Sequence, residues 1–452
     1  MADVQLSPTG TRVCVDTPLR LRFDHPVRLG STGRLEVRNE DGTLAAHVDL
    51  ADPRVGRRTI GGARSDHGEL HLWHYHPVLV DGGEVTVVLP VTLEPEQHYT
   101  VTVDPGFVIG HRGVAAEDAW SFRTGTLPAR DVTTLTVDAT GAGDFCTVQG
   151  AVDHVPEQNQ RHVLVQIAAG TYTEIVYVPQ TKGNLTLRGA GRRRTVIGYA
   201  NNDVLNGDAA MRGEPIESSC CPKRAIPSSD RFNCWRAVLG IDADDVTVEQ
   251  LTIQNTTPAG GGQAEALRGN GERIRVRDTR LLSRQDTVRL QGSCYLADSY
   301  VEGDVDFVWG SGALFVERTE LKAVGPGYYT QLRNADGGPG AVFVDVRLTR
   351  AAEVPDGASW LSRVELSRFG GSQVVFIDAA MDAHIAPAGW LATDRSEQWD
   401  TSRLQLAEHG STTLDGQPLD LSGRDPMARP LTADEAAQLR DPRRLLGGWD
   451  PR

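Results

Sequence analysis

Short β-rich segments recur along the chain after residue 130, and no long amphipathic helix lies between them. They follow one another at intervals of roughly 20 to 30 residues, the range in which structural repeats stack into a solenoid. The segments are 163–167, 185–187, 246–253, 274–281, 288–296, 314–321, 342–348 and 374–377. A fold of alternating strands and helices would need a helix in each interval. We therefore interpret each segment as one coil of a right-handed parallel β-helix with apolar side chains stacked in its bore.

Residues 12 to 125 show a different pattern, in which short alternating strands are broken by turns. The expected strands are 13–15, 19–23, 35–37, 70–75, 85–89, 99–103 and 120–122. Their spacing is typical of a β-sandwich. The sequences PTG at residues 8–10 and FRT at residues 122–124 resemble the two ends of bacterial immunoglobulin-like modules. We therefore predict an all-β chain in three parts: an immunoglobulin-like β-sandwich (1–126), a linker (127–130) and the β-helix (131–452).

One short helix is expected near the end of the chain. The sequence TADE at residues 432–435 is a capping box, in which a threonine and a glutamate satisfy the first backbone N–H groups of a helix. We predict that this helix runs to Leu439 and packs against the side or the end of the solenoid.

The charge balance limits the partners of this chain. Its 452 residues carry a net charge of -14, which would repel a nucleic-acid backbone or an anionic membrane surface. No apolar run approaches the ~20 residues that span a bilayer. The first residues lack a basic and then apolar signal segment, although a chain from which such a segment had been removed would look the same. We expect no nucleic acid and no membrane among the partners, and the composition leaves the compartment open.

The cysteines form no recognisable framework. They are too few and too scattered for a small disulfide-stapled domain, and the adjacent Cys220 and Cys221 lack the spacing of metal ligands. The six are Cys14, Cys146, Cys220, Cys221, Cys234 and Cys294. We expect buried free thiols. In an oxidising compartment a bridge from Cys220 or Cys221 to Cys234 is an alternative, because sequence alone cannot fix connectivity.

Four polar residues recur at the spacing of one coil. Asp286 and Asp306 are 20 residues apart, and Gln263 and Gln285 are 22 residues apart. Residues one coil apart in a parallel β-helix lie above one another at the strand spacing of about 4.8 Å. If each interval is one coil, the two carboxylates and the two amides share a stripe on the surface. The carboxylates would then be close enough to interact.

A carboxylate pair of this kind suits ester cleavage. Like charges at short range cannot both ionise at low cost, so one carboxyl group keeps its proton while the other stays anionic. An arginine nearby would select the anion, and Arg363 is a candidate from a later coil. The glutamine amides can donate hydrogen bonds to a developing oxyanion. Stacked polar residues also form ladders with no catalytic role, which is the alternative for any one of them.

Three ordered motifs around these residues resemble those of the pectin methylesterase family. They are QAEAL at residues 263–267, QDT at 285–287 and DFVWG at 306–310. The flanking sequences GDFCTVQ (143–149), GTYTE (170–174) and GWDP (448–451) are similar to the family as well. The resemblance extends over about residues 131 to 452. It implies an extracellular enzyme that removes methyl esters from pectin, works as a monomer and needs no metal or cofactor.

The resemblance also implies residue roles. Asp306 would attack the ester carbonyl, and Asp286 would protonate the departing methanol and then activate water against the acyl-enzyme. Gln263 and Gln285 would bind the oxyanion. Arg363 would keep Asp306 ionised and oriented through a charge-assisted hydrogen bond.

One motif departs from the family pattern and concerns substrate contacts. Where the family has LGRPW, this chain has LSRVE at residues 361–365, so that Glu365 replaces the tryptophan expected to contact the sugar. Trp309 stands where the family more often has phenylalanine. We expect Trp309 and Phe307 to provide part of the aromatic surface and Glu365 to lie at the substrate. Arg368 offers a rival alignment for the site arginine.

Other functions stay open on the sequence alone. A pectate lyase or a polygalacturonase shares the β-helix, although a lyase would need a calcium-binding carboxylate cluster. An esterase or thioesterase acting on another acyl substrate is consistent with Glu365. So is a non-catalytic carbohydrate-binding or adhesion protein on the same scaffold, because fold does not settle function. Release of methanol from highly methylated pectin would separate these possibilities.

Overall fold

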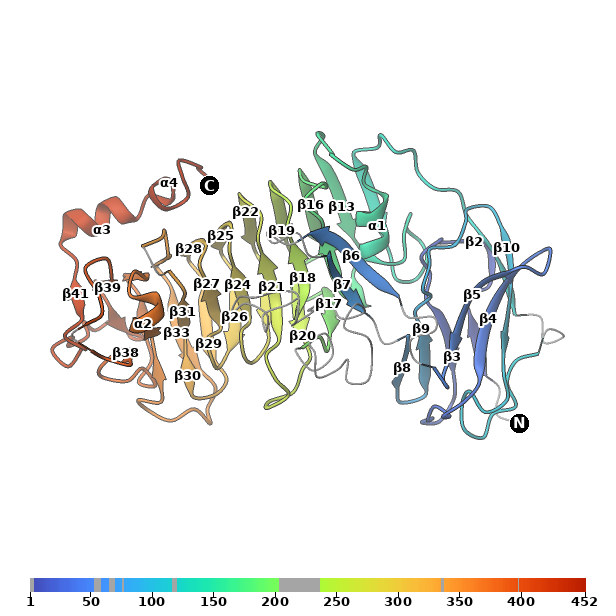
Figure 1. Ribbon diagram of the computed structural model, residues 1–452, viewed down its shortest axis with the longest axis horizontal. Helices are drawn as coiled ribbons and strands as arrows, with labels where there is room; N and C mark the ends of the chain where they lie inside the picture. The colour runs from blue at the N-terminus through green and yellow to red at the C-terminus, as the bar shows by residue number, and fades with distance from the viewer. Residues whose placement is uncertain are drawn as a thin grey trace.

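The chain forms an elongated molecule with two parts arranged end to end (Figure 1). The computed structural model describes residues 4–52, 58–64, 70–74, 77–115, 120–202, 236–334, 337–396 and 398–452. The first strands lie at one end, and the last two helices lie at the other end along one side (Figure 1). Within these described ranges, no helix is both long and apolar enough to cross a membrane.

Two antiparallel sheets build the N-terminal part. One contains β1 (Gln5–Ser7), β3 (Leu19–Arg22), β9 (Glu84–Val87) and β8 (Val78–Asp81), and the other contains β2 (Gly10–Val13), β11 (Ser121–Thr124), β10 (His98–Val103), β4 (Arg34–Asn39) and β5 (Leu44–Asp49). Among the described strands of these two sheets, only β2 and β11 pair in parallel. Alternate residues of β10, including Tyr99 and Val101, point into a common apolar core. The alternation gives the β-sandwich that the sequence predicted. A separate hairpin joins β6 (Thr59–Arg64) and β7 (Leu70–His74).

Three parallel sheets build the rest of the chain and confirm the predicted β-helix. The first sheet stacks β12 (Thr134–Val137), β13 (Val163–Ile167), β16 (Leu185–Gly189), β19 (Val246–Glu249), β22 (Ile274–Arg277), β25 (Ser293–Ala297), β28 (Ala313–Glu317), β32 (Ala341–Val344), β36 (Gln373–Ile377), β39 (Gln405–His409) and β41 (Ala428–Pro430). The second stacks β14 (Gly170–Thr173), β17 (Thr195–Tyr199), β20 (Thr252–Asn255), β23 (Arg280–Leu282), β26 (Tyr300–Gly303), β29 (Glu320–Ala323), β33 (Arg347–Arg350), β37 (Ala380–Met381) and β40 (Thr412–Thr413). The third stacks β15 (Val176–Val178), β18 (Ala237–Ile241), β21 (Glu265–Gly269), β24 (Val288–Leu290), β27 (Val308–Gly310) and β31 (Thr330–Leu332).

Most of the predicted coils contain two strands where the sequence suggested one. Segment 274–281, for example, divides into β22 and β23. A single residue with a left-handed backbone turns the chain from the first sheet to the second, and in this segment it is Asp278, with φ of +48°. The following residue, Thr279, is fully buried. Only Asp278 and Thr279 separate the two short strands, and for that reason the segment looked like one strand.

The same corner repeats along the solenoid. The left-handed residues other than glycine between the first and second sheets are Gln250, Asp278, Asp298, Arg318, Asp345 and Asp378. Most are polar residues with short side chains, which tolerate this conformation better than branched residues do. The bore inside is filled with stacked apolar side chains, among them Phe343 and Phe376, whose parallel rings lie 4.5 Å apart.

Separate elements pack at the start of the bore and along one side of the solenoid. At the start, α1 (Val148–His154) buries most of its residues against the first coil. Val15 of the N-terminal part belongs to the same apolar cluster as the bore. Near the other end, α3 (Ala433–Leu439) begins with the predicted capping box of Thr432 and Glu435. It packs with α4 (Pro442–Leu445) against the outer face of the first sheet, so the helix prediction is confirmed.

Candidate active site

The two aspartates selected from the sequence lie together at one corner of the β-helix. Asp286 and Asp306 each stand two residues before a strand of the third sheet, and the register pairs Val288 of β24 with Val308 of β27. The aspartates therefore occupy equivalent positions on consecutive coils, separated by about the 4.8 Å strand spacing. Both have a left-handed backbone, with φ of +69° and +52°. Only 2% and 4% of their surfaces are exposed.

Burial raises the pKa of both carboxyl groups, but to different extents. For Asp286 the pKa rises to about 7, because desolvation and the charges of Asp306 and Glu265 outweigh the attraction of Arg236. For Asp306 the pKa rises to about 6, because Arg363 and Arg333 offset part of the desolvation. Near neutral pH, Asp286 is therefore protonated to a greater extent than Asp306, which is held as the anion by Arg363 and Arg333.

Arg363 contacts Asp306 directly. It lies in β35 (Ser362–Glu365), and its Nη2 donates a hydrogen bond to Oδ2 of Asp306. Arg368, the rival candidate, instead pairs with Glu365 at 3.3 Å. Oδ1 of Asp306 has no hydrogen-bond partner among the described residues. The arginine thus anchors one oxygen of the carboxylate and leaves the other available to a ligand.

Arg236 is a site residue that the sequence did not reveal. It stands immediately before β18, is fully buried, and donates from Nη2 to Oδ2 of Asp286 at 3.0 Å. Nη1 of the same guanidinium donates to Oε1 of Gln263. The contact to Gln263 fixes which end of the amide is the oxygen, so the amide N–H groups face the other way.

The two glutamines lie on neighbouring coils, as their spacing indicated. The backbone N–H of Ala264 donates to the carbonyl of Gln285 at 3.2 Å. Both glutamine side chains are half-buried at the edge of the stripe that carries the aspartates. Amide N–H groups at this position can donate hydrogen bonds to a developing oxyanion.

An arginine-rich pocket lies beside the aspartates. It measures about 150 Å³ and is lined by Arg289, Gln291, Trp309, Ser311, Arg333 and Phe369. The guanidinium carbons of Arg333 and Arg289 lie 4.5 and 5.0 Å from the centre of the Trp309 ring. The indole is only 2% exposed and is covered by these cations. It shapes the pocket wall, and its face is not open to a sugar ring in this structure.

A second aromatic pair lies next to Arg363 and was also missed. β30 (Gly327–Tyr328) pairs with β34 (Ser359–Trp360), which brings the rings of Tyr328 and Trp360 to 5.6 Å. The guanidinium carbon of Arg363 lies 4.8 Å from the centre of the Tyr328 ring. Both aromatic residues are partly exposed. They therefore offer an apolar surface beside the carboxylate of Asp306.

The sequence pattern that defines the pectinesterase family matches residues 134–413, more than half of the chain. The chain belongs to the pectinesterase family. Pectinesterase 31 of Arabidopsis thaliana is 30% identical over 255 residues, which cover 56% of this chain and 75% of that relative. It follows that the chain is a carboxylic ester hydrolase of the pectinesterase class.

Solved structures of pectin methylesterases share the fold. The enzyme from carrot matches with a TM-score of 0.58 and 23% identity, over 71% of this chain and 95% of the carrot chain. A pectin methylesterase in complex with hexasaccharide VII matches with a TM-score of 0.54 and 22% identity, over 70% of this chain and 98% of that chain. At these identities the likeness establishes the β-helix fold. The roles of individual residues depend on the local geometry of the site.

Two of the expected substrate contacts of this pectinesterase need revision. Phe307 is 1% exposed, and its ring packs 4.6 Å from that of Tyr329 inside the bore, so the structure does not support a sugar contact. Trp309 lies outside the bore but is covered by Arg289 and Arg333. Glu365 is partly exposed at the start of α2 (Leu366–Phe369), and its contact with substrate stays a prediction.

One group of residues in the described part of the pectinesterase could hold a metal ion. It consists of Cys14, Asp16 and Cys146, whose ligand atoms lie within 4.8 Å of one another. The group lies where the N-terminal part meets α1, several coils from the aspartates. The bridge considered from Cys220 or Cys221 to Cys234 falls outside the described residues.

Proposed function

We propose that this pectinesterase hydrolyses the methyl esters of pectin through an acyl-enzyme formed on Asp306, with Asp286 as the general acid and base. The observation that carries the proposal is the asymmetry of the aspartate pair. Arg363 holds one oxygen of Asp306 and its pKa is about 6, while the pKa of Asp286 is about 7. Near neutral pH such a pair holds one negative charge and one proton, which is what ester cleavage needs.

The first half of the reaction releases methanol. Oδ1 of ionised Asp306, which has no hydrogen-bond partner in the described structure, attacks the carbonyl carbon of the ester. The amides of Gln263 and Gln285 donate to the oxyanion that forms. Asp286 gives its proton to the methoxyl oxygen, the carbon–oxygen bond breaks, and methanol leaves. The product is an acid anhydride between Asp306 and the uronate.

The second half regenerates the carboxylates. Asp286, now ionised, removes a proton from a water molecule, and the resulting hydroxide attacks the uronate carbonyl of the anhydride. The glutamine amides stabilise the oxyanion again. Asp306 departs as a carboxylate, which Arg363 stabilises, and Asp286 holds the proton for the next cycle. The uronic acid is released without a net change in the enzyme.

We also propose that Tyr328 and Trp360 provide the sugar-binding surface that the family tryptophan supplies elsewhere. The pair is partly exposed, and Tyr328 is stacked against the same Arg363 that holds Asp306. An apolar ring face next to the reacting carboxylate suits the C–H face of a pyranose ring. Glu365, at the other end of β35, would repel free carboxylates and favour highly methylated pectin.

The wider organisation is part of the same proposal. We infer a β-sandwich domain (1–126), a linker (127–130) and a catalytic β-helix domain (131–452), acting as a monomer outside the cell, where pectin is found. All the proposed catalytic residues lie in the third part, which supports the division. The apolar cluster shared between Val15 and the bore indicates that the two domains are held together in a fixed contact.

Methanol release from highly methylated pectin tests the function. We expect turnover by the wild-type chain and none by Asp306→Asn, whose amide cannot attack an ester. A panel of acetyl esters and acyl thioesters decides the rival function as a general esterase or thioesterase. Turnover of a thioester with no release of methanol would reject pectin as the substrate while leaving the aspartate mechanism intact.

A further inference from the structure

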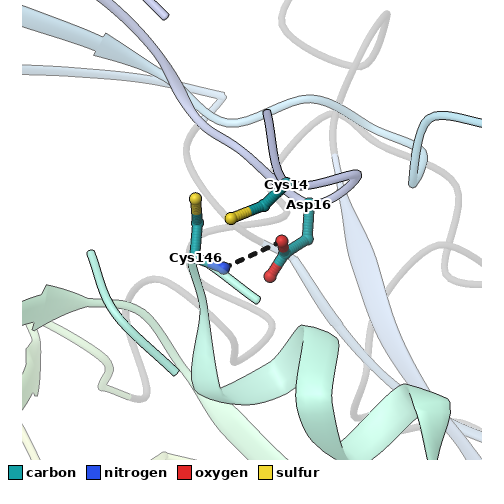
Figure 2. A group of neighbouring side chains, drawn as sticks. All are labelled: Cys14, Asp16 and Cys146. Carbon is teal, nitrogen blue, oxygen red and sulfur yellow. Dashed lines mark hydrogen bonds between the residues drawn. The ribbon is translucent and has the colours of Figure 1, made fainter. Parts of the chain in front are cut away.

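Two cysteines from distant parts of the sequence meet where the sandwich contacts the β-helix. Cys14 follows β2 of the sandwich, and Cys146 lies two residues before α1 (Figure 2). Their sulfur atoms lie within 4.8 Å of one another. Both residues are buried, with 6% of their surface exposed. They therefore face each other across the contact between the two proposed domains.

The backbone around the pair is held in place by Asp16. One carboxylate oxygen of Asp16 accepts from the N–H of Cys146 at 3.0 Å. The other accepts from the N–H of Thr147 at 2.8 Å and from its hydroxyl at 2.5 Å. Cys14 and Asp16 belong to one short segment, so these bonds keep Cys146 beside Cys14. Rotation of the two thiol side chains changes the distance between the sulfur atoms, and a disulfide brings the two Cβ atoms to about 3.5–4.5 Å.

We propose that Cys14 and Cys146 are the site of a disulfide that links the sandwich covalently to the first coil of the β-helix. Two S–H bonds break and one S–S bond forms. The two electrons and two protons pass to a disulfide oxidant, which is reduced to two thiols. The link requires an oxidising compartment, in agreement with an enzyme that acts on an extracellular polysaccharide.

The surroundings favour a disulfide over a bound metal ion. Asp16 already accepts three hydrogen bonds from the chain, and together with the two sulfur atoms it would supply three protein ligands where structural zinc sites have four. The neighbouring Cys146 and burial raise the pKa of the Cys14 thiol. A protonated thiol is a poor metal ligand and a slow nucleophile. We therefore expect the bond to form as the chain folds, before the two thiols are buried.

A pocket of about 440 Å³ is lined by both cysteines and by residues of the two domains, including Pro8 and Ala139. It gives small reagents a route to the sulfur atoms in the folded protein. Cys294, in contrast, is buried inside the β-helix core. It provides a matched control, because it is a buried thiol that belongs to neither domain contact nor pocket.

The test is peptide mapping of the full chain refolded with oxidised glutathione, then alkylated under denaturing conditions. We expect one cross-linked pair joining the peptides of Cys14 and Cys146, with a mass lower by two hydrogen atoms, and alkylated Cys294. Alkylation of both Cys14 and Cys146 would refute the proposal. So would a bridge from either of them to Cys220, Cys221 or Cys234, or a bound zinc ion that Cys14→Ser removes.

Thermal unfolding provides a second readout. The oxidised wild type and Cys294→Ser should both melt at a lower temperature after full reduction. Cys14→Ser and Cys146→Ser should give the same midpoint with and without reductant. If reduction lowers the midpoint of Cys14→Ser as much as that of the wild type, the stabilising bridge lies elsewhere in the chain. Neither readout depends on the catalytic proposal, because methanol release does not enter the measurement.

Discussion

Aspartates with a left-handed backbone occupy two corners of the β-helix, and the two sets have opposite surroundings. Between the first and second sheets, Asp298 and Asp378 are about half exposed and form ion pairs with Arg318 and Arg440 at the surface. Before the third sheet, Asp286 and Asp306 are almost completely buried. The aspartates at the two corners thus share residue type and backbone conformation and differ in burial.

The difference lies in what surrounds each carboxylate. At the exposed corner the side chain is solvated, and its ion pair contributes little because water and salt screen it. At the buried corner desolvation raises the pKa, and Arg236 and Arg363 each hold one carboxylate in a fixed orientation. At both corners the left-handed aspartate turns the chain. Where two such aspartates are buried next to arginines, their pKa values shift and the pair can take part in catalysis.

The largest expected difference between the corners concerns the nucleophile. Asp306→Asn should lower kcat by about 10⁴-fold or more, because an amide cannot form the anhydride. Asp298→Asn, the same change in the same backbone conformation, should leave kcat within about twofold, as expected for a surface substitution. Methanol release under saturating pectin measures both. Comparable losses in the two variants would show that the substitution acts through the fold.

The pH dependence of kcat/KM should report the buried pair, because kcat/KM follows the ionisation of the free enzyme. Asp306 must be ionised, so activity should fall as the pH drops below its pKa of about 6. Asp286 must be protonated for the first step, so activity should also fall as the pH rises above about 7. The result is a narrow bell with its maximum between these values. Asp298→Asn should reproduce the wild-type bell, and a flat profile across this range would contradict the assignment.

Arg236→Gln should have an intermediate effect and should change the shape of the bell. The guanidinium lowers the pKa of Asp286, so its loss should move the alkaline limb to higher pH. Loss of the anchor on Gln263 should also lower kcat, by about 10- to 100-fold, because the oxyanion donor is no longer fixed. Arg236→Lys keeps a positive charge beside Asp286, so it should move the alkaline limb part of the way back to its wild-type pH. It should not restore the orientation of the Gln263 amide.

Arg318→Gln is the matched control for that variant, since Arg318 holds Asp298 at the exposed corner. It should change neither kcat nor the alkaline limb. Melting temperatures measured alongside show whether Arg236→Gln is folded. A folded Arg236→Gln enzyme with an unchanged pH profile would mean that this arginine has only a structural role.

The contrast between the corners also explains what the sequence could predict. The repeat predicted the fold and the pairing of Asp286 with Asp306, because the 20 residues that separate them fall within the range of one coil. The 22-residue spacing of Gln263 and Gln285 likewise predicted that they lie on neighbouring coils. Arg236 did not, because its contact with Asp286 spans 50 residues and depends on a long side chain that reaches across coils. No local pattern marks such a contact.

The errors arose where the chain leaves the repeat. A left-handed residue resets which side chains face the bore, so Phe307, immediately after Asp306, turned inward and lost its predicted contact with the sugar. Tyr328 and Trp360 lie in a two-stranded sheet outside the three long sheets. Their positions depend on how two excursions from the solenoid pair with each other, which the period of the coils does not encode.

The smallest expected effect concerns this aromatic surface. An aromatic contact contributes about 0.5–1.5 kcal/mol beyond the apolar area that it buries. Trp360→Ala should therefore raise the KM for highly methylated pectin by about 3- to 10-fold and leave kcat nearly unchanged, because the ring contacts the sugar and not the reacting carbonyl. Trp449→Ala is the matched control: Trp449 is partly buried on the face of the first sheet, with the guanidinium of Arg275 at 5.8 Å. That variant should lower the melting temperature and keep the wild-type KM. An unchanged KM in Trp360→Ala, together with a higher KM after removal of Trp309, would place the sugar over the arginine-rich pocket instead.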